Sequence, residues 1–140
     1  MSRVQLAINV ESLEEAIDFY SRLFDAVPAK VQPGYANFAI AEPPLKLVLF
    51  EKKGKGGSIN HLGVEVQTTE EVLTTDDRLT RADMMTTGID ETQCCYAEKT
   101  EVWVDGPDGV RWEWYVKHAD SDQFENVVIA SSQSKRKCCT

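Results

Sequence analysis

His61-Leu62-Gly63-Val64-Glu65-Val66 decides how this chain folds, because its apolar and polar side chains alternate and an earlier stretch repeats it. Alternation with a period of two residues is typical of a half-buried β-strand. The earlier stretch, Gln5-Leu6-Ala7-Ile8-Asn9-Val10, lies 56 positions before it and has Gln5 where the later copy has His61. Each copy therefore begins with a polar side chain that can bind a metal ion.

A helix is predicted after each of the two strands. Glu15 follows Ser12 by three residues and Glu71 follows Thr68 by three residues, which is the capping-box spacing of a helix start. The first helix should begin at about Leu13 and present one core-facing stripe of apolar residues, namely Leu13, Ala16, Ile17, Tyr20, Leu23 and Phe24. The second helix should run to about Met85, and three of its residues should face inward: Val72, Leu79 and Ala82.

The duplication predicts an α+β fold of two βαβββ modules in one chain, which form a curved mixed sheet around a metal-binding cup. The first module is expected at residues 1–52 and the second at residues 60–117. A linker at residues 53–59 is glycine-rich and charged, and its spacing matches neither phosphate-binding glycine motif, so we expect a connector. Residues 118–140 are expected to form a polar C-terminal tail.

Composition limits the class of protein. The 140 residues are 42% hydrophobic, enough for a packed core in one domain or two small halves. A formal net charge of −8 argues against non-specific nucleic-acid binding, which needs a basic face. The apolar runs are too short to span a membrane, and the N-terminus enters a strand pattern directly, so we expect a cytoplasmic protein. Both halves of the expected cup lie in one chain, so a monomer would suffice and a homodimer remains open.

Three polar side chains are candidates for a metal site. Gln5 and His61 occupy equivalent positions in the two copies, and Glu113 is flanked by Trp112 and Trp114. A carboxylate in such surroundings must be paired, hydrogen-bonded or bound to a cation. One carboxamide oxygen, one imidazole and one carboxylate can hold a divalent metal and leave open positions for water, oxygen or substrate. The alternative is that His61 is a hydrogen-bonded core residue, which is the commoner role of a single histidine in a strand.

The four cysteines form two adjacent pairs, Cys94-Cys95 and Cys138-Cys139. Adjacent side chains in a regular strand point to opposite faces, so Cys94 and Cys95 can share one centre only if residues 92–97 form an irregular loop. A vicinal dithiol binds soft centres such as Cd(II), Hg(II) or trivalent arsenic, although two incidental cysteines remain an alternative. The Cys138-Cys139 pair lies in the expected tail, and we interpret it as accessory or incidental.

Several motifs together resemble the vicinal oxygen chelate superfamily, which holds glyoxalase I, bleomycin- and fosfomycin-resistance proteins and extradiol dioxygenases. They are the paired βαβββ modules, the strand that begins at His61, the turn Asp105-Gly106-Pro107-Asp108-Gly109 and the strand around Glu113. Within this superfamily the chain is similar to the cadmium-induced and organoarsenical-lyase branch. That similarity rests on three runs: Tyr35-Ala36-Asn37-Phe38, Glu42-Pro43-Pro44-Leu45 and Cys94-Cys95-Tyr96-Ala97.

The resemblance implies an enzyme that uses Fe(II) and O2 to cleave the carbon–arsenic bond of a methyl- or aryl-As(III) compound, releasing inorganic arsenite. It implies that Gln5, His61 and Glu113 hold the iron, although Ni, Co or Zn could replace it, and that Cys94 and Cys95 bind the arsenic. Lys99 would favour the thiolate forms of these cysteines, and their loop would close over the substrate. Gln5 departs from the wider superfamily, in which histidine is common at the first ligand position.

The sequence leaves two other functions open. One is a glyoxalase-like metalloenzyme on the same scaffold, a Ni- or Zn-dependent isomerase or glutathione transferase that works without oxygen. The other is a non-catalytic detoxification protein that sequesters cadmium or arsenite through its vicinal thiols.

Overall fold

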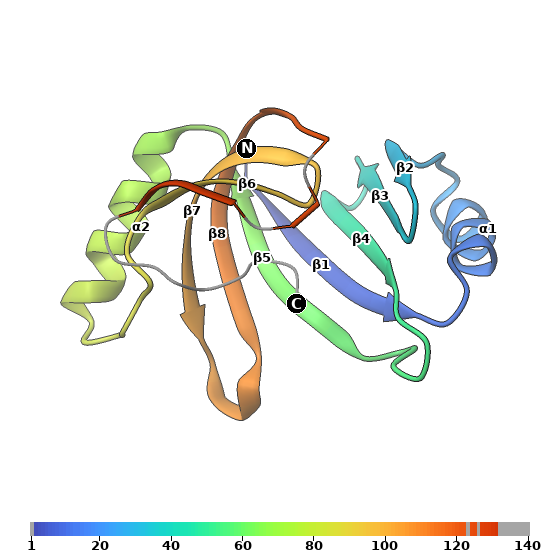
Figure 1. The fold of residues 1–140 in the computed structure, drawn as a ribbon, viewed down its shortest axis with the longest axis horizontal. Coiled ribbons are helices and arrows are strands. Elements are labelled where there is room, and N and C mark those ends of the chain that lie inside the picture. Colours follow the sequence, from blue (N-terminus) through green and yellow to red (C-terminus); the bar gives the residue numbers. More distant parts are fainter. Residues whose placement is uncertain (1, 123, 126, 132–140) are drawn as a thin grey trace. The chain divides into compact units, whose positions relative to one another are not determined.

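A computed structural model describes residues 2–122, 124–125 and 127–131. The chain divides into two compact units (Figure 1). The first unit is Arg3–Leu62, and the second contains Gly63–Thr140 together with residues 1–2. The division falls inside one strand, β5 (Ile59–Val66), between Leu62 and Gly63. Among the described residues, no helix is long and apolar enough to cross a bilayer.

The first unit is a βαβββ module followed by the start of β5. Its elements are β1 (Arg3–Val10), α1 (Leu13–Phe24), β2 (Lys30–Gln32), β3 (Tyr35–Ile40) and β4 (Leu45–Glu51). The strands lie in the order β2-β3-β4-β1-β5. β1 and β4 pair in parallel, with Gln5 opposite Lys46, whereas β3 pairs antiparallel with both β2 and β4. The predicted order of elements is confirmed for this module.

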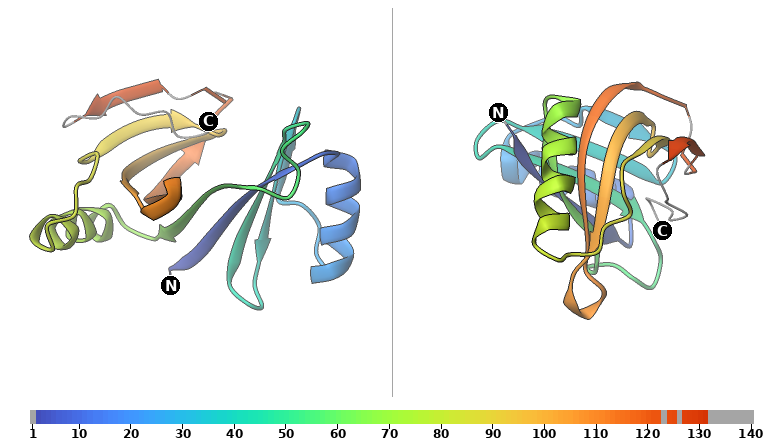
Figure 2. Two further views of the ribbon diagram at one scale, coloured as in Figure 1. Left: turned by 90° about the horizontal axis from the view of Figure 1, so that it is seen from below. Right: turned by 90° about the vertical axis from the view of Figure 1, so that its left-hand side faces the viewer.

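Helix α1 packs on one face of the first unit's sheet (Figure 2). Ser12 caps it by accepting a hydrogen bond from the Glu15 backbone N–H, as the sequence predicts. Most of the predicted stripe contacts the core, which includes Phe38 and Leu49. Leu23 is the exception: its side chain is 58% exposed, so its assignment to the stripe was wrong. The opposite face of β1 buries polar residues, since Gln5 and Asn9 are 4% and 5% exposed.

The second unit contains the other βαβββ module and one further strand. Its elements are the end of β5, α2 (Thr69–Arg81), β6 (Asp90–Cys94), β7 (Ala97–Asp105), the short 3-10 helix η1 (Pro107–Gly109), β8 (Arg111–Asp120) and β9 (Val127–Ser131). The strands lie in the order β5-β8-β7-β6-β9. Thr68 and Glu71 form the predicted capping box, and Val72 and Leu79 face the core. The two modules confirm the α+β fold class.

Two predictions for the second unit were wrong. Helix α2 ends at Arg81 rather than near Met85, because Asp83 has a left-handed φ of 62°, which cannot continue the helix. Ala82 is exposed. The segment predicted as a polar tail also contains regular structure. β8 continues to Asp120, and β9 pairs antiparallel with β6. Cys138 and Cys139 lie outside the described residues.

The loop before β5 is organised around one carboxylate. Glu11 accepts hydrogen bonds from the backbone N–H groups of Gly54 and Gly56, with N···O distances of 2.8 Å to Oε2 in both cases. Lys53 Nζ also donates to the Glu11 backbone carbonyl. These contacts lower the pKa of Glu11, and the Gly54 and Gly56 hydrogen bonds have the largest effect. The glycine-rich connector thus binds a carboxylate of its own chain, the Glu11 side chain, rather than the phosphate of a ligand.

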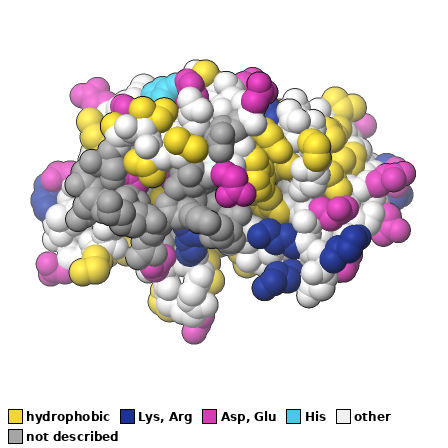
Figure 3. All heavy atoms as spheres, in the orientation of Figure 1, with side chains coloured by type: hydrophobic (Ala, Val, Ile, Leu, Met, Phe, Trp, Pro, Cys, Tyr) yellow, Lys and Arg dark blue, Asp and Glu magenta, His cyan; other side chains and the backbone are white. Residues whose placement is uncertain are grey.

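Acidic side chains are dispersed over the face shown in Figure 3 and do not gather into one patch there. Several of them make local contacts instead. Asp18 and Arg22, for example, form an exposed ion pair one helical turn apart, with an N···O distance of 2.8 Å. Exposed, locally paired carboxylates of this kind are typical of a solvated surface.

Candidate metal and thiol sites

Gln5 and His61 are brought together in the first unit. Gln5 Nε2 lies 3.1 Å from His61 Nε2, and both side chains are buried. The other ring nitrogen, Nδ1, lies 2.8 Å from Asn60 Oδ1. An amide oxygen only accepts hydrogen bonds, so Nδ1 carries the proton and Nε2 presents its lone pair to Gln5. The Phe50 ring packs beside the imidazole, with 6.2 Å between ring centroids.

The spacing of these two side chains suits neighbouring ligands of one cation. Two atoms bound at right angles to an octahedral ion, at about 2.1 Å each, lie roughly 3.0 Å apart. The observed separation is 3.1 Å. Rotating the Gln5 amide exchanges its oxygen and nitrogen, so the same position can offer an oxygen to a metal. Within the described residues, no three His, Cys, Asp or Glu side chains gather as a metal cluster.

Glu113 lies in the second unit and takes part in a buried ionic cluster. Lys99 Nζ donates to Glu113 Oε1 at 2.9 Å and lies 3.6 Å from Glu101 Oε1. The Lys99 ammonium also lies 5.1 Å from the centroid of the Tyr115 ring. The Lys99 ammonium thus compensates the burial of the Glu113 carboxylate.

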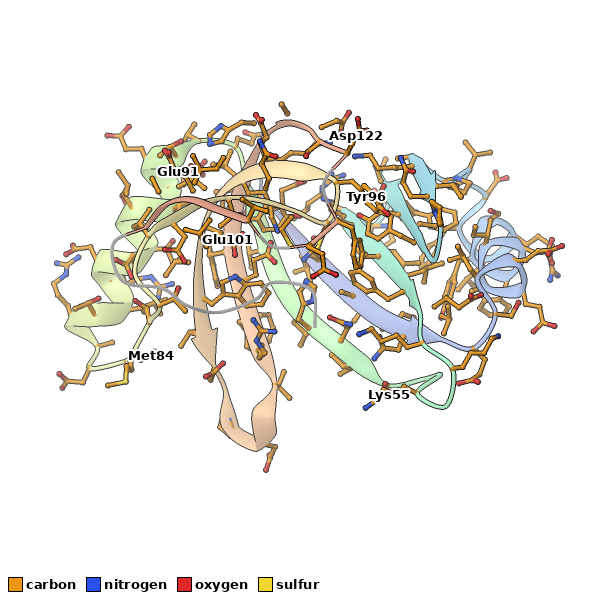
Figure 4. The ribbon with its side chains drawn as sticks, in the orientation of Figure 1. Lys55, Met84, Glu91, Tyr96, Glu101 and Asp122 are labelled. Carbon is orange, nitrogen blue, oxygen red and sulfur yellow. The ribbon has the colours of Figure 1, made fainter. Side chains whose placement is uncertain are left out.

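Glu101, labelled in Figure 4, is a second buried carboxylate of this cluster. It accepts hydrogen bonds from Thr92 Oγ1 at 2.6 Å and from Trp103 Nε1. Burial raises the pKa of Glu101; the positive charge of Lys99 opposes that rise, and the negative charge of Glu113 adds to it. Three titratable groups thus share one buried region of the second unit.

Cys94 and Cys95 have neighbouring sulfurs. Their Sγ atoms lie 3.1 Å apart, well beyond the roughly 2.05 Å of a disulfide bond. A soft atom bonded to both at roughly 2.3 Å, the length of a zinc–thiolate bond, would make an S–M–S angle of about 85° at the observed 3.1 Å. Such an angle suits pyramidal trivalent arsenic, whose bonds are close to mutually perpendicular.

The backbone brings the two sulfurs together in a different way from the one expected, since residues 92–97 do not form an irregular loop. Cys94 ends β6 and pairs with Ala97, the first residue of β7, so Cys95 and Tyr96 form a two-residue hairpin turn. Both turn residues have left-handed φ angles, 53° and 63°. The turn takes Cys95 out of the strand alternation that would have separated the sulfurs.

The hairpin turn is supported by the segment that follows β8. Cys95 N–H donates to the Phe124 carbonyl at 3.0 Å, and Ser121 N–H donates to the Tyr96 carbonyl at 2.9 Å. The rings of Tyr96 and Phe124 also pack together, with centroids 5.5 Å apart. Cys94 is fully buried, whereas the Cys95 side chain is partly exposed.

Cys94 faces the same side of the second unit's sheet as the ionic cluster. Directly opposed residues of an antiparallel pair share a face, and Cys94 is opposite Ala97. Alternation along β7 then places Lys99, Glu101 and Trp103 on that face, and Trp103 is opposite Glu113 on β8. Within the second unit, one sheet face therefore carries a predicted arsenic ligand and a predicted metal ligand.

Sequence reasoning missed Glu101 and Asn60. Glu101 is separated from Lys99 by one residue in a strand, a pattern that could have indicated two charges on one buried face. Asn60 precedes His61 directly, and no sequence signal predicts its contact with the ring. Lys99 was expected to act on the thiols, and the structure shows it in ion pairs with Glu113 and Glu101.

Comparison with known proteins identifies a matching protein family. The family described as the Glyoxalase/Bleomycin resistance protein/Dioxygenase superfamily matches residues 3–114. Among solved structures, the Mn(II)-bound glyoxalase from Novosphingobium aromaticivorans matches with a TM-score of 0.59 and 16% identity. That match covers 88% of this chain and 43% of the glyoxalase chain. At this identity the likeness shows the fold alone.

Two curated relatives are much more similar in sequence. Cadmium-induced protein CadI of Mycobacterium tuberculosis is 60% identical over 124 residues, which are 89% of this chain and 82% of the relative. The trivalent organoarsenical cleaving enzyme of Thermomonospora curvata is 49% identical over an alignment that covers all of this chain and 89% of the relative.

Proposed function

The chain belongs to the glyoxalase/bleomycin resistance protein/dioxygenase superfamily, and we propose that it cleaves the carbon–arsenic bond of trivalent organoarsenicals, with O2 as the oxidant. The relatives named for organoarsenical cleavage support this activity. The atoms balance for methylarsenite: CH3As(OH)2 and O2 give As(OH)3 and formaldehyde. The carbon is oxidised and O2 is reduced, while arsenic stays trivalent.

The observation that carries the proposal is the 3.1 Å separation of the Cys94 and Cys95 sulfurs. Each thiol replaces one hydroxyl of the arsenical and releases one water, so the two sulfurs hold arsenic while its organic group stays attached. Because the turn sets the sulfurs side by side before the substrate binds, little conformational entropy is lost on chelation.

We propose Gln5, His61 and Glu113 as the ligands of a divalent metal, with Fe(II) as the physiological ion. When bound, Fe(II) supplies the activation of O2. The roles of the three side chains differ. His61 would offer its Nε2 lone pair, since Nδ1 is directed to Asn60, and Gln5 would offer a neutral oxygen once its amide rotates. Glu113 would offer a carboxylate oxygen.

Thiol variants test the arsenic-binding role. Cys94→Ser and Cys95→Gly should each abolish tight binding of phenylarsenite and release of arsenite, and bound iron should be unchanged. Glycine is chosen at position 95 because it favours the left-handed φ of the turn while removing the thiol. The double variant Cys138→Ser/Cys139→Ser is the matched control and should keep full activity. Retained demethylation in both single variants would contradict the proposal.

Oxygen dependence separates this function from its rivals. The protein with bound Fe(II) should release arsenite from methylarsenite in air and none under strict anaerobic conditions, with formaldehyde and arsenite formed in equal amounts. Turnover that persists without oxygen would favour a glyoxalase-like isomerase or transferase. A stoichiometric complex that never releases arsenite would favour a sequestering protein.

A further inference from the structure

The imidazole of His61 stands at the end of a hydrogen-bond chain within the first unit. The series of hydrogen bonds starts at the backbone carbonyl of Lys55, which lies in the loop before β5 (Figure 4). Ser58 Oγ donates to this carbonyl at 2.6 Å, and Asn9 Nδ2 donates to Ser58 Oγ at 2.9 Å. Asn60 Nδ2 donates to Asn9 Oδ1 at 3.1 Å, and Asn60 Oδ1 lies 2.8 Å from His61 Nδ1.

The direction of every hydrogen bond in this chain follows from its first member. A backbone carbonyl can only accept, so the Ser58 hydroxyl must donate to it and can only accept from Asn9. The Asn9 amide must then direct its nitrogen to Ser58 and its oxygen to Asn60. Asn60 in turn directs its nitrogen to Asn9 and its oxygen to His61.

The last step determines the tautomer of the imidazole. Because Asn60 presents an oxygen, His61 must carry its proton on Nδ1 and keep a lone pair on Nε2. The opposite side of the ring agrees with this assignment, since the Gln5 amide nitrogen lies 3.1 Å from Nε2 and can only donate.

We propose that Ser58, Asn9 and Asn60 are positioning residues that hold His61 in the Nδ1–H tautomer, so that Nε2 is the ligand atom. The proposal rests on the proposed function in one respect, the role of His61 as a metal ligand. We call this series of hydrogen bonds the relay. It begins at a backbone carbonyl, which can only accept, and no side-chain rotation can change that. The carbonyl therefore fixes which atoms donate and which accept in all three side chains up to the ring. A partner on the second ring nitrogen orients the ring and raises its basicity as a ligand.

Backbone hydrogen bonds hold Asn9 next to Ser58. Asn9 N–H donates to the Ser58 carbonyl at 2.9 Å, and Gly57 N–H donates to the Asn9 carbonyl at 2.8 Å. Asn9 is buried, whereas Ser58 is exposed, so the relay runs from the solvent-facing loop toward the buried ring. If the Ser58 hydroxyl is removed, water can both donate and accept in its place, and the polarity is no longer imposed on Asn9.

The direct test is 15N NMR of the metal-free protein with labelled histidine at one fixed pH. His118, the other histidine of the chain, is the internal reference. The unmodified protein and Ser58→Thr should show the Nδ1–H form of His61. Ser58→Ala should show a mixture of tautomers, and Asn60→Leu should lose the Nδ1–H preference. Asn37→Leu is the matched control, because Asn37 is a buried amide of the same unit that donates to Tyr35 Oη outside the relay.

Metal affinity gives the second readout, with Co(II) titrated into each variant. Asn60→Leu should bind Co(II) about 10–100-fold more weakly, the usual effect of losing such a partner, whereas Ser58→Thr and Asn37→Leu should match the unmodified protein. The inference is overturned if His61 keeps one tautomer in both Ser58→Ala and Asn60→Leu, or if Asn60→Leu binds Co(II) normally. Failure of the proposed function would appear differently, as absent arsenite release by the unmodified protein with the tautomer results unchanged.

Discussion

Lys99 Nζ donates to Glu113 Oε1 at 2.9 Å, and the two side chains are only 5% and 1% exposed. Glu101 is the second carboxylate beside the same ammonium, with an N···O distance of 3.6 Å. One buried cation thus serves two buried carboxylates, and the cluster carries excess negative charge when all three groups are ionised. This excess of negative charge would favour the binding of a cation by Glu113, a proposed metal ligand.

Lys99→Met should destabilise the fold strongly, because it leaves two carboxylates buried without their cation. Breaking a buried ion pair in this way costs about 3–5 kcal/mol. Urea denaturation at neutral pH measures the loss. Lys117→Met is the control, since Lys117 pairs with the exposed Asp120 at 2.6 Å and should cost no more than about 1 kcal/mol. Equal losses in the two variants would show that Lys99 has no special electrostatic role.

Glu101→Gln should change how stability depends on pH. Burial raises the pKa of Glu101 above its ordinary value of 4.5, so the folded protein binds this proton more tightly than the unfolded chain. The resulting stabilisation is complete below pH 4.5 and is lost as pH rises through the raised pKa. The variant lacks this titration, so its free energy of unfolding should fall less steeply above pH 4.5.

Urea midpoints measured at several pH values would test this. Glu98→Gln, on the same strand, reports the effect of removing one carboxylate from β7. A slope in Glu101→Gln identical to that of the unmodified protein would rule out the assignment of this titration to Glu101.

Glu11→Gln should act on the acid side of the pH profile. Hydrogen bonds from the Gly54 and Gly56 backbones lower the pKa of Glu11 below 4.5, so its contribution to stability is present above that pH. The contribution is lost as pH falls through the lowered pKa, because the protonated carboxyl accepts these bonds less strongly. The variant should be less stable at neutral pH and should lose less stability on acidification.

Chemical denaturation between neutral pH and pH 3 follows this effect, with Glu14→Gln as a control for an exposed carboxylate nearby. An unchanged midpoint at neutral pH in Glu11→Gln would mean that the loop does not depend on this anion.

Gln5→Leu should weaken binding of a divalent metal, because it removes the amide that lies 3.1 Å from His61 Nε2. We expect a loss of at least about tenfold, since losing even an outer-shell partner costs that much. Gln5→His should keep the affinity or raise it, because imidazole is a stronger ligand than an amide for transition metals. Isothermal titration with Co(II) measures both, and equal affinity in Gln5→Leu would exclude Gln5 as a ligand.

The sequence by itself determined the duplicated plan of this protein. Strand alternation and the capping pairs Ser12–Glu15 and Thr68–Glu71 are local patterns, so they locate strands and helix starts without knowledge of the fold. The repeat also singled out Gln5 and His61, which the first unit places 3.1 Å apart.

Only the tertiary structure decided how the polar groups are matched. Glu11 fills a glycine-rich loop that lies more than 40 positions further along the chain. Strand register brings Lys99 of β7 next to Glu113 of β8. The two sulfurs meet because pairing of β6 with β7 places Cys95 in a left-handed turn conformation, which residue type alone does not select. Hydrogen-bond partners across strands depend on register and on turn geometry, and neither of these is a local property of the sequence.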